Sequence, residues 1–193
     1  MKGGHDMKKA LAILSVLTLV GAAAAADRPV EGKKWEFSTA FGFESYSYEG
    51  SMGAATILNF PVRLGYYLWK GLEFEPELKF TSYHYSGGGS ESGALFTLNL
   101  AYNFKLKSPG LIPFVLGGYG FGDGYAHLLM FVEPLPDGVN ATAYNFGGGI
   151  KYLFGNIAAL RLEYRYTHWM SEKLGASNDY DIHNILVGIS LFF

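Results

Sequence analysis

The sequence contains no cysteine, so it has neither a disulfide framework nor a thiolate ligand for a metal, and a lipid-modified N-terminal cysteine is excluded. Charged residues are scarce, at 17% of the chain, and their signs nearly cancel to a formal net charge of −2. A chain without an excess of positive charge lacks the basic surface that binds the phosphate backbone of nucleic acid, so we expect no nucleic-acid partner.

Long apolar runs are also missing. The apolar segment of residues 10–20 follows Lys8 and Lys9 and precedes small residues up to Ala26. It is too short to cross a bilayer as a helix, and its pattern is typical of a secretory signal peptide. We therefore expect a signal peptide over residues 1–26, translated from Met1 or Met7, and a mature domain over residues 27–193.

Aromatic residues and glycine are abundant, with 14 Tyr, 15 Phe and 26 Gly, and this composition favours an all-β chain with short turns. From Trp35 onward, apolar and polar residues alternate with a period of two, which places each set on one face of a strand. In residues 72–81, for example, one face is apolar and the other carries Glu73, Glu75 and Glu77. Three glutamates could not lie unpaired in a dry core.

The alternation predicts eight strands, joined by three tight turns and four longer loops. The predicted strands are residues 35–48, 58–68, 72–81, 96–106, 111–125, 144–152, 160–168 and 183–193. The predicted loops are residues 49–53, 86–92, 127–140 and 171–180. An even number of strands that are apolar on one face and ionised on the other predicts an eight-stranded antiparallel transmembrane β-barrel, apolar outside and polar inside. We expect it in the outer membrane of a Gram-negative-type bacterium, with the long loops outside the cell.

The inward positions carry balanced charge. Six cations are predicted inside, Arg63, Lys79, Lys105, Lys151, Arg161 and Arg165, with six anions, Glu36, Glu44, Glu73, Glu75, Glu77 and Glu163. Eight strands leave an interior only wide enough for side chains, so these groups predict a salt-bridge network rather than a path for general diffusion.

Four runs carry a resemblance to known proteins: residues 113–120 (PFVLGGYG), 147–154 (GGGIKYLF), 160–168 (LRLEYRYTH) and 186–193 (LVGISLFF). They resemble the small eight-stranded outer-membrane barrel proteins, and within these the lipid A 3-O-deacylase, or acyloxyacyl hydrolase-like, branch. The likeness covers about residues 113–193. The glycines and the terminal Phe193 are general features of such barrels, and the likeness implies that the barrel-assembly machinery recognises Phe193.

The deacylase likeness implies a catalytic histidine on the lipid-facing side, followed two positions later by a serine nucleophile, with an acid beyond it. Here His168 would be the base, Ser171 the nucleophile and Asp181 the orienting acid, with Asp179 as a second candidate acid. Met170 occupies the position where the family has serine. Strict alternation turns Ser171 toward the lumen, so it could serve only after a bulge or a change of direction.

Two functions follow as hypotheses. The first is a non-enzymatic barrel with a structural or interaction role through its extracellular loops, and the alternative is a deacylase-like ester hydrolase. His168 is then a catalytic base, the relic of one, or an ordinary interfacial histidine. His168 and His183 without a carboxylate pattern do not predict a metal site, so we expect no metal or cofactor. The expected partners are outer-membrane lipid and lipopolysaccharide.

Overall fold

The computed structural model describes residues 30–47, 54–85, 88–106, 110–123, 140–173, 176–177 and 180–193. The expected signal peptide, most of the predicted loops and Asp179 lie outside these ranges. Eight strands form the wall: β1 (Trp35–Ser47), β2 (Ala54–Trp69), β3 (Leu72–Tyr85), β4 (Ser90–Asn103), β5 (Leu111–Asp123), β6 (Asn140–Phe154), β7 (Ala158–Lys173) and β9 (Tyr180–Phe192). The two-residue β8 (Ala176–Ser177) pairs with the end of β7.

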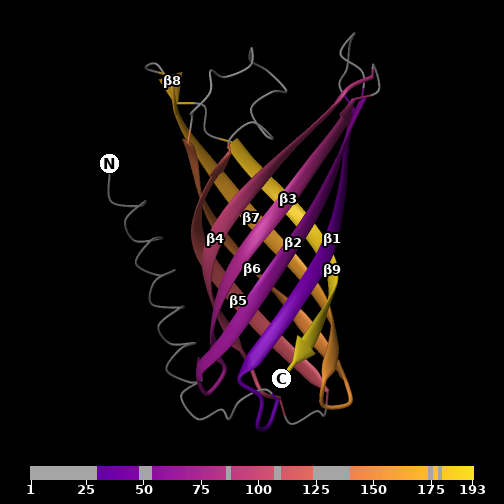
Figure 1. The fold of residues 1–193 in the computed structure, drawn as a ribbon, viewed down its shortest axis with the longest axis vertical. Coiled ribbons are helices and arrows are strands. Elements are labelled where there is room, and N and C mark those ends of the chain that lie inside the picture. The colour runs from indigo at the N-terminus through magenta and orange to yellow at the C-terminus, as the bar shows by residue number, and fades with distance from the viewer. Residues whose placement is uncertain are drawn as a thin grey trace, which may run out of the picture.

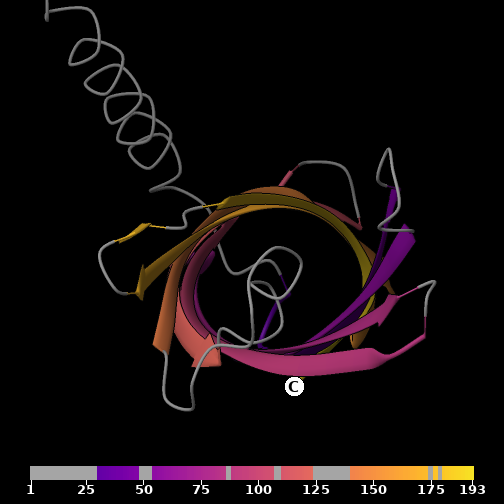
Figure 2. The same ribbon diagram turned by 90° about the horizontal axis from the view of Figure 1, so that it is seen from above.

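The strands close into a barrel. Each wall strand pairs antiparallel with its neighbour in sequence, and the β1–β9 pairing joins the first strand to the last. The strands are strongly tilted (Figure 1), and the view from above shows the closed ring (Figure 2). The predicted eight-stranded antiparallel fold is confirmed. Within the described ranges, no helix is long and apolar enough to cross a membrane.

Several strands are longer at their outer ends than predicted. Strand β4 begins at Ser90, inside the predicted loop of residues 86–92, and β7 continues to Lys173, inside the predicted loop of residues 171–180. Pairing with β3 and β6 supplies backbone hydrogen bonds whatever the side chains are, so the ladder extends past the hydrophobic alternation.

The start of β1, the end of β9 and the tight turn between β2 and β3 lie on one rim. Trp69 pairs with Leu72 across a two-residue turn in which Lys70 and Gly71 have φ angles of 39° and 109°. Positive φ at both central residues is the backbone form that matches the twist of a hairpin. The Trp35 amide donates to the Phe193 carbonyl at 2.9 Å on the same rim, where the C-terminus is marked in Figure 1. We call this the inner rim, because outer-membrane barrels have short turns on the periplasmic side.

The two faces of the wall are inverted relative to a water-soluble barrel. In β3, Phe74, Leu78 and Phe80 are 37–46% exposed on the outside, while Glu73, Glu75 and Glu77 are at most 1% exposed inside. Because the backbone hydrogen bonds run between strands around the ring, such a wall can lie in lipid with its polar groups satisfied.

The seam between β1 and β9 is shorter than the strands that form it. Seven residue pairs join them, from Glu36↔Phe192 to Gly42↔Leu186. Strand β1 continues along β2 to Ser47, and β9 begins at Tyr180 along β7. Among the described residues, positions 43–47 and 180–185 therefore have no partner across the seam at the outer end.

Candidate functional site

The inner half of the lumen holds the charged network that the alternation predicts. Ten of the twelve predicted residues are buried there: Glu36, Arg63, Glu73, Glu75, Glu77, Lys79, Lys151, Arg161, Glu163 and Arg165. The prediction for Lys105 is wrong, because β4 ends at Asn103 and Lys105 is exposed beyond the wall. The backbone amide of Asn103 donates to the Gly71 carbonyl at 2.8 Å. Beyond this bond, side chains no longer alternate between the lumen and the outer face. The side chain of Glu44 lies outside the described part of the chain.

The network is a chain of alternating charges. The Arg161 guanidinium makes a bidentate contact with the Glu75 carboxylate, at 2.6 and 3.2 Å, and its Nε donates to Glu163 at 2.9 Å. Arg165 links Glu163, at 2.5 Å, to Glu77, at 2.6 Å. These side chains are 0–2% exposed. Guanidinium–carboxylate pairs of this geometry combine charge with directional hydrogen bonds, so they hold the network in one arrangement.

A second branch lies nearer the inner rim. The Lys151 ammonium lies 2.6 Å from Glu36 and 3.2 Å from Glu73, and the Tyr67 hydroxyl donates to Glu36 at 2.6 Å. Within the described ranges, Glu36, Glu73 and Glu75 are the one group of metal-type ligands whose atoms all lie within 4.8 Å of one another. Three cations already contact these three carboxylates: Lys151, Arg161 and, at 3.9 Å from Glu75, Arg63. A metal ion would therefore have to displace an ammonium or guanidinium group.

Toward the outer end the lumen loses its charges. An uncharged polar layer comes first, with Asn59 bonded to Asn184 at 3.1 Å and Asn145 bonded to Asn99 at 3.0 Å. A buried apolar cluster follows, formed by Leu95, Ala143 and Ile182. At the inner end, another apolar cluster contains Val30, Tyr67, Ile112, Ala159 and Phe192. In the part of the chain that the structure describes, side chains therefore fill the interior in successive layers.

A polar cluster lies on the outer face of the barrel near its outer end. The His168 Nδ1 lies 2.6 Å from Asp181 Oδ1, and the Tyr166 hydroxyl donates to the same oxygen at 2.7 Å. His168 and Asp181 are directly opposite each other on β7 and β9. The histidine ring stacks on Tyr144 of β6, with ring centroids 4.7 Å apart. The structure thus brings together two of the three predicted site residues, on the lipid-facing side.

The cluster extends to a second histidine. His183 is opposite Tyr166, and its Nδ1 lies 2.6 Å from the Tyr164 hydroxyl. Alternation predicted the face of His183 but no contact for it, because the partner depends on the register between β7 and β9. Tyr164 and Tyr166 lie in the predicted strand of residues 160–168, where a period of two places them on the same face as His168.

The third predicted site residue, Ser171, lies in β7 opposite Ala141. The β6–β7 register is continuous from Phe154↔Ala158 to Ala141↔Ser171, so the backbone shows no bulge between His168 and Ser171. The Ser171 side chain lies outside the described residues, and its role as a nucleophile stays a prediction.

A comparison with protein families decides the relationship. The model described as "Outer membrane protein beta-barrel domain" matches residues 12–193. The chain belongs to this outer-membrane β-barrel family. Its location follows from the family and from the apolar outer wall: the protein is a bacterial outer-membrane barrel. A comparison with curated protein sequences found no match.

Two solved outer-membrane barrels share the fold. The N-terminal β-barrel domain of Pseudomonas aeruginosa OprF is 19% identical, with a TM-score of 0.51, over 84% of this chain and 100% of that chain. Neisserial surface protein A (NspA) is 18% identical, with a TM-score of 0.53, over 82% of this chain and 96% of that chain. At these identities the likeness concerns the fold alone, and none of the comparisons points to a lipid A deacylase.

Proposed function

We propose that this outer-membrane barrel is a sealed, non-conducting anchor that acts through the segments joining its strands outside the cell. The observation that carries the proposal is the filled lumen, in which Arg161, Arg165 and their carboxylate partners span the interior with side chains 0–2% exposed. A solute would have to break several ion pairs in a confined space to pass. Removing one member of a buried pair typically costs about 3–5 kcal/mol.

Conductance measurements test the seal. The refolded full chain in planar bilayers is expected to give no sustained channel current, and liposomes containing it are expected not to swell in an isosmotic sugar solution. The double variant Arg165→Ser/Glu77→Ser removes one cation and one anion, so it preserves the charge balance while shortening two side chains that meet at 2.6 Å. We expect it to conduct more than the wild type. A wild-type protein with stable open-channel current would contradict the proposal.

The interaction role is tested in cells. Deleting the gene is expected to weaken the outer-membrane barrier to detergent, and the full-length protein should restore it. A variant with residues 126–138 replaced by a short Gly-Ser linker leaves every wall strand intact and should fail to restore the barrier. If this variant restored the barrier, residues 126–138 would not be required for the function of the protein.

A second candidate is the deacylase-like ester hydrolase, which is supported by the His168–Asp181 contact of 2.6 Å on the lipid-facing side. A carboxylate on Nδ1 orients the ring and leaves Nε2 to act as a base, as in other histidine-dependent hydrolases. In this proposal Ser171 supplies the attacking hydroxyl, and the outer end of β7 has to turn for it to reach His168, because the β6–β7 register is regular as far as Ser171.

Mass spectrometry of lipid A separates the two candidates. Cells that express an active hydrolase would lose a 3-linked acyl chain, and His168→Ala and Ser171→Ala would each abolish the loss. Unchanged lipid A would remove this candidate and leave the sealed anchor. The substitution His84→Ala, at an exposed histidine on β3, is the matched control.

A further inference from the structure

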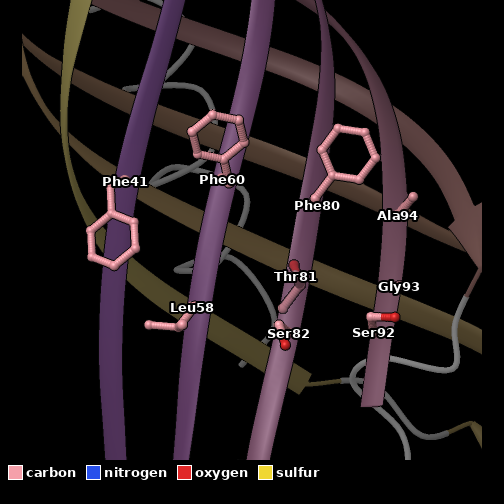
Figure 3. Close-up of a pocket in the computed structure, with 9 residues that line it drawn as sticks. All are labelled: Phe41, Leu58, Phe60, Phe80, Thr81, Ser82, Ser92, Gly93 and Ala94. Atoms are coloured by element: carbon pink, nitrogen blue, oxygen red, sulfur yellow. The ribbon is translucent and has the colours of Figure 1, made fainter. Parts of the chain in front are cut away.

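The outer surface over β1 to β4 contains a shallow groove with a volume of about 540 Å³. Three phenylalanine rings, those of Phe41, Phe60 and Phe80, line it together with Leu58. Each of the three phenylalanines is 46–51% exposed on the outer face. Figure 3 shows them on three adjacent strands, with small side chains beside them on β3 and β4.

The groove arises from the register between β3 and β4. Phe80 is opposite Ala94, and two positions further out Ser82 is opposite Ser92. Ala94, Ser82 and Ser92 have small side chains, so the outer surface is recessed at these positions relative to the neighbouring phenylalanine rings. Gly93, between Ala94 and Ser92, also lines the groove. The depression is therefore built by residue size on a regular sheet.

The groove has an apolar end and a hydroxyl-bearing end at different depths in the membrane. A tilted transmembrane strand crosses the hydrocarbon region in about 9–11 residues. Counted from the inner rim, Phe80 is the ninth residue of β3 and Ser82 is the eleventh. On β4, counted the same way, Ala94 is the tenth residue and Ser92 the twelfth. The rings thus lie at hydrocarbon depth, and the serines lie where chains join head groups.

We propose that this groove binds one acyl chain of a lipopolysaccharide molecule in the outer leaflet. The chain lies against the three phenylalanine rings, and the hydroxyls of Ser82 and Ser92 face the polar linkage at the head of the chain. The outer-membrane location makes lipid the material that covers this face, and the depth of the groove places it in the outer leaflet. The inference does not depend on whether the lumen conducts.

Two aspects of the site favour a held chain over general lipid contact. A flat lipid-facing surface offers a chain one side of contact, whereas a groove contacts it on several sides, and dispersion contacts accumulate with each atom pair. The serine pair also orients the bound chain, because its hydroxyls can donate hydrogen bonds to the ester or amide carbonyl at the head of the chain. Ser82 already has a polar neighbour, since its Oγ lies 3.2 Å from the His84 Nε2 at the exposed outer end.

Filling the groove tests the proposal. The variant Ala94→Phe places a ring in its floor. The matched control is Gly117→Phe on the lipid-facing side of β5, away from the groove, where an added Cβ meets its nearest atom at an ordinary 3.7 Å. Both variants add a phenylalanine ring to the outer wall, and heat-dependent gel mobility verifies that each one folds. Native mass spectrometry of the refolded full chain with added lipid A then measures the fraction that retains a lipid.

The wild type and Gly117→Phe are expected to retain one lipid A molecule, and Ala94→Phe is expected to lower the association constant about tenfold, equivalent to 1.4 kcal/mol. The double variant Ser82→Ala/Ser92→Ala should lower it to a smaller extent. Retention by Ala94→Phe equal to that of Gly117→Phe, or no retention by the wild type, would overturn the proposal. Equal retention of phosphatidylethanolamine would overturn the assignment to lipopolysaccharide.

Discussion

The substitution Arg161→Met tests how much of the barrel's stability depends on the lumen network. The Arg161 guanidinium contacts Glu75 at 2.6 and 3.2 Å and Glu163 at 2.9 Å, and all three side chains are 0% exposed. Methionine retains much of the volume but none of the charge, so Glu75, Glu163 and Glu36, which lies 3.7 Å from the guanidinium, lose a shared cation. Glu163 keeps Arg165, at 2.5 Å, whereas Glu75 keeps only a contact of 3.9 Å with Arg63.

The expected loss follows from this geometry. Summing a charged hydrogen bond of about 1.5–3 kcal/mol for each contact would overestimate it, because the contacts share one cation and the lumen can relax. Removing one partner of a buried ion pair costs about 3–5 kcal/mol, and we expect a loss in that range. The measurement is urea unfolding of the full chain in lipid vesicles, with the unfolding midpoint and slope fitted together.

Two further variants make this test specific to the pair. Adding Glu75→Gln to Arg161→Met should recover part of the loss, so that the double variant falls short of the sum of the single changes by about 0.5–3 kcal/mol. Lys105→Met removes a cation that is exposed outside the wall and should change stability by less than about 0.5 kcal/mol. A loss below about 1 kcal/mol for Arg161→Met, the size of an exposed ion pair, would refute the reasoning.

Three other predictions concern the backbone. Gly65→Ala would place a methyl group onto the Glu73 carboxylate and should lower the free energy of unfolding by about 1–3 kcal/mol in the same assay; an unchanged midpoint would contradict this close packing. Gly71→Ala introduces a side chain at a φ of 109° and should reduce the yield of refolded, heat-modifiable protein on a gel, whereas a wild-type yield would argue against a strained turn. Hydrogen–deuterium exchange should be faster at residues 180–185 of β9 than at residues 186–192, because the former lack partners across the β1 seam; uniform protection would show that this end of the seam is paired.

The alternation of side chains predicted the wall and the lumen residues because a period of two directly reports which face a residue is on. It assigned Arg161 and Glu163 to the lumen without any knowledge of their partners. It assigned Lys105 wrongly, because alternation does not reveal where a strand leaves the wall. That point is set by the bond between the Asn103 amide and the Gly71 carbonyl, which depends on the hairpin partner.

Contacts between side chains on different strands could not be predicted, because the alternation does not determine the register in which two strands pair. The sequence placed His168 and Asp181 on the same face, but their 2.6 Å contact depends on the pairing of β7 with β9. The groove could not be predicted from the sequence for the same reason, since Phe80 and Ala94 are brought opposite each other only by the β3–β4 register. A size contrast between cross-strand neighbours becomes visible only once the register is known.

The seam has a consequence for how the barrel assembles. Its seven pairs run from Glu36↔Phe192 to Gly42↔Leu186, almost the greatest separation in sequence within the described residues, while every other wall pairing joins neighbours in sequence. Contacts between distant residues carry the largest loop-closure entropy and form slowly. The hairpins can therefore form early as an open, curved sheet, and the ring closes last, when β9 meets β1. Until that moment the two edge strands are unpaired, so the rate of closure sets how long the chain is exposed to aggregation.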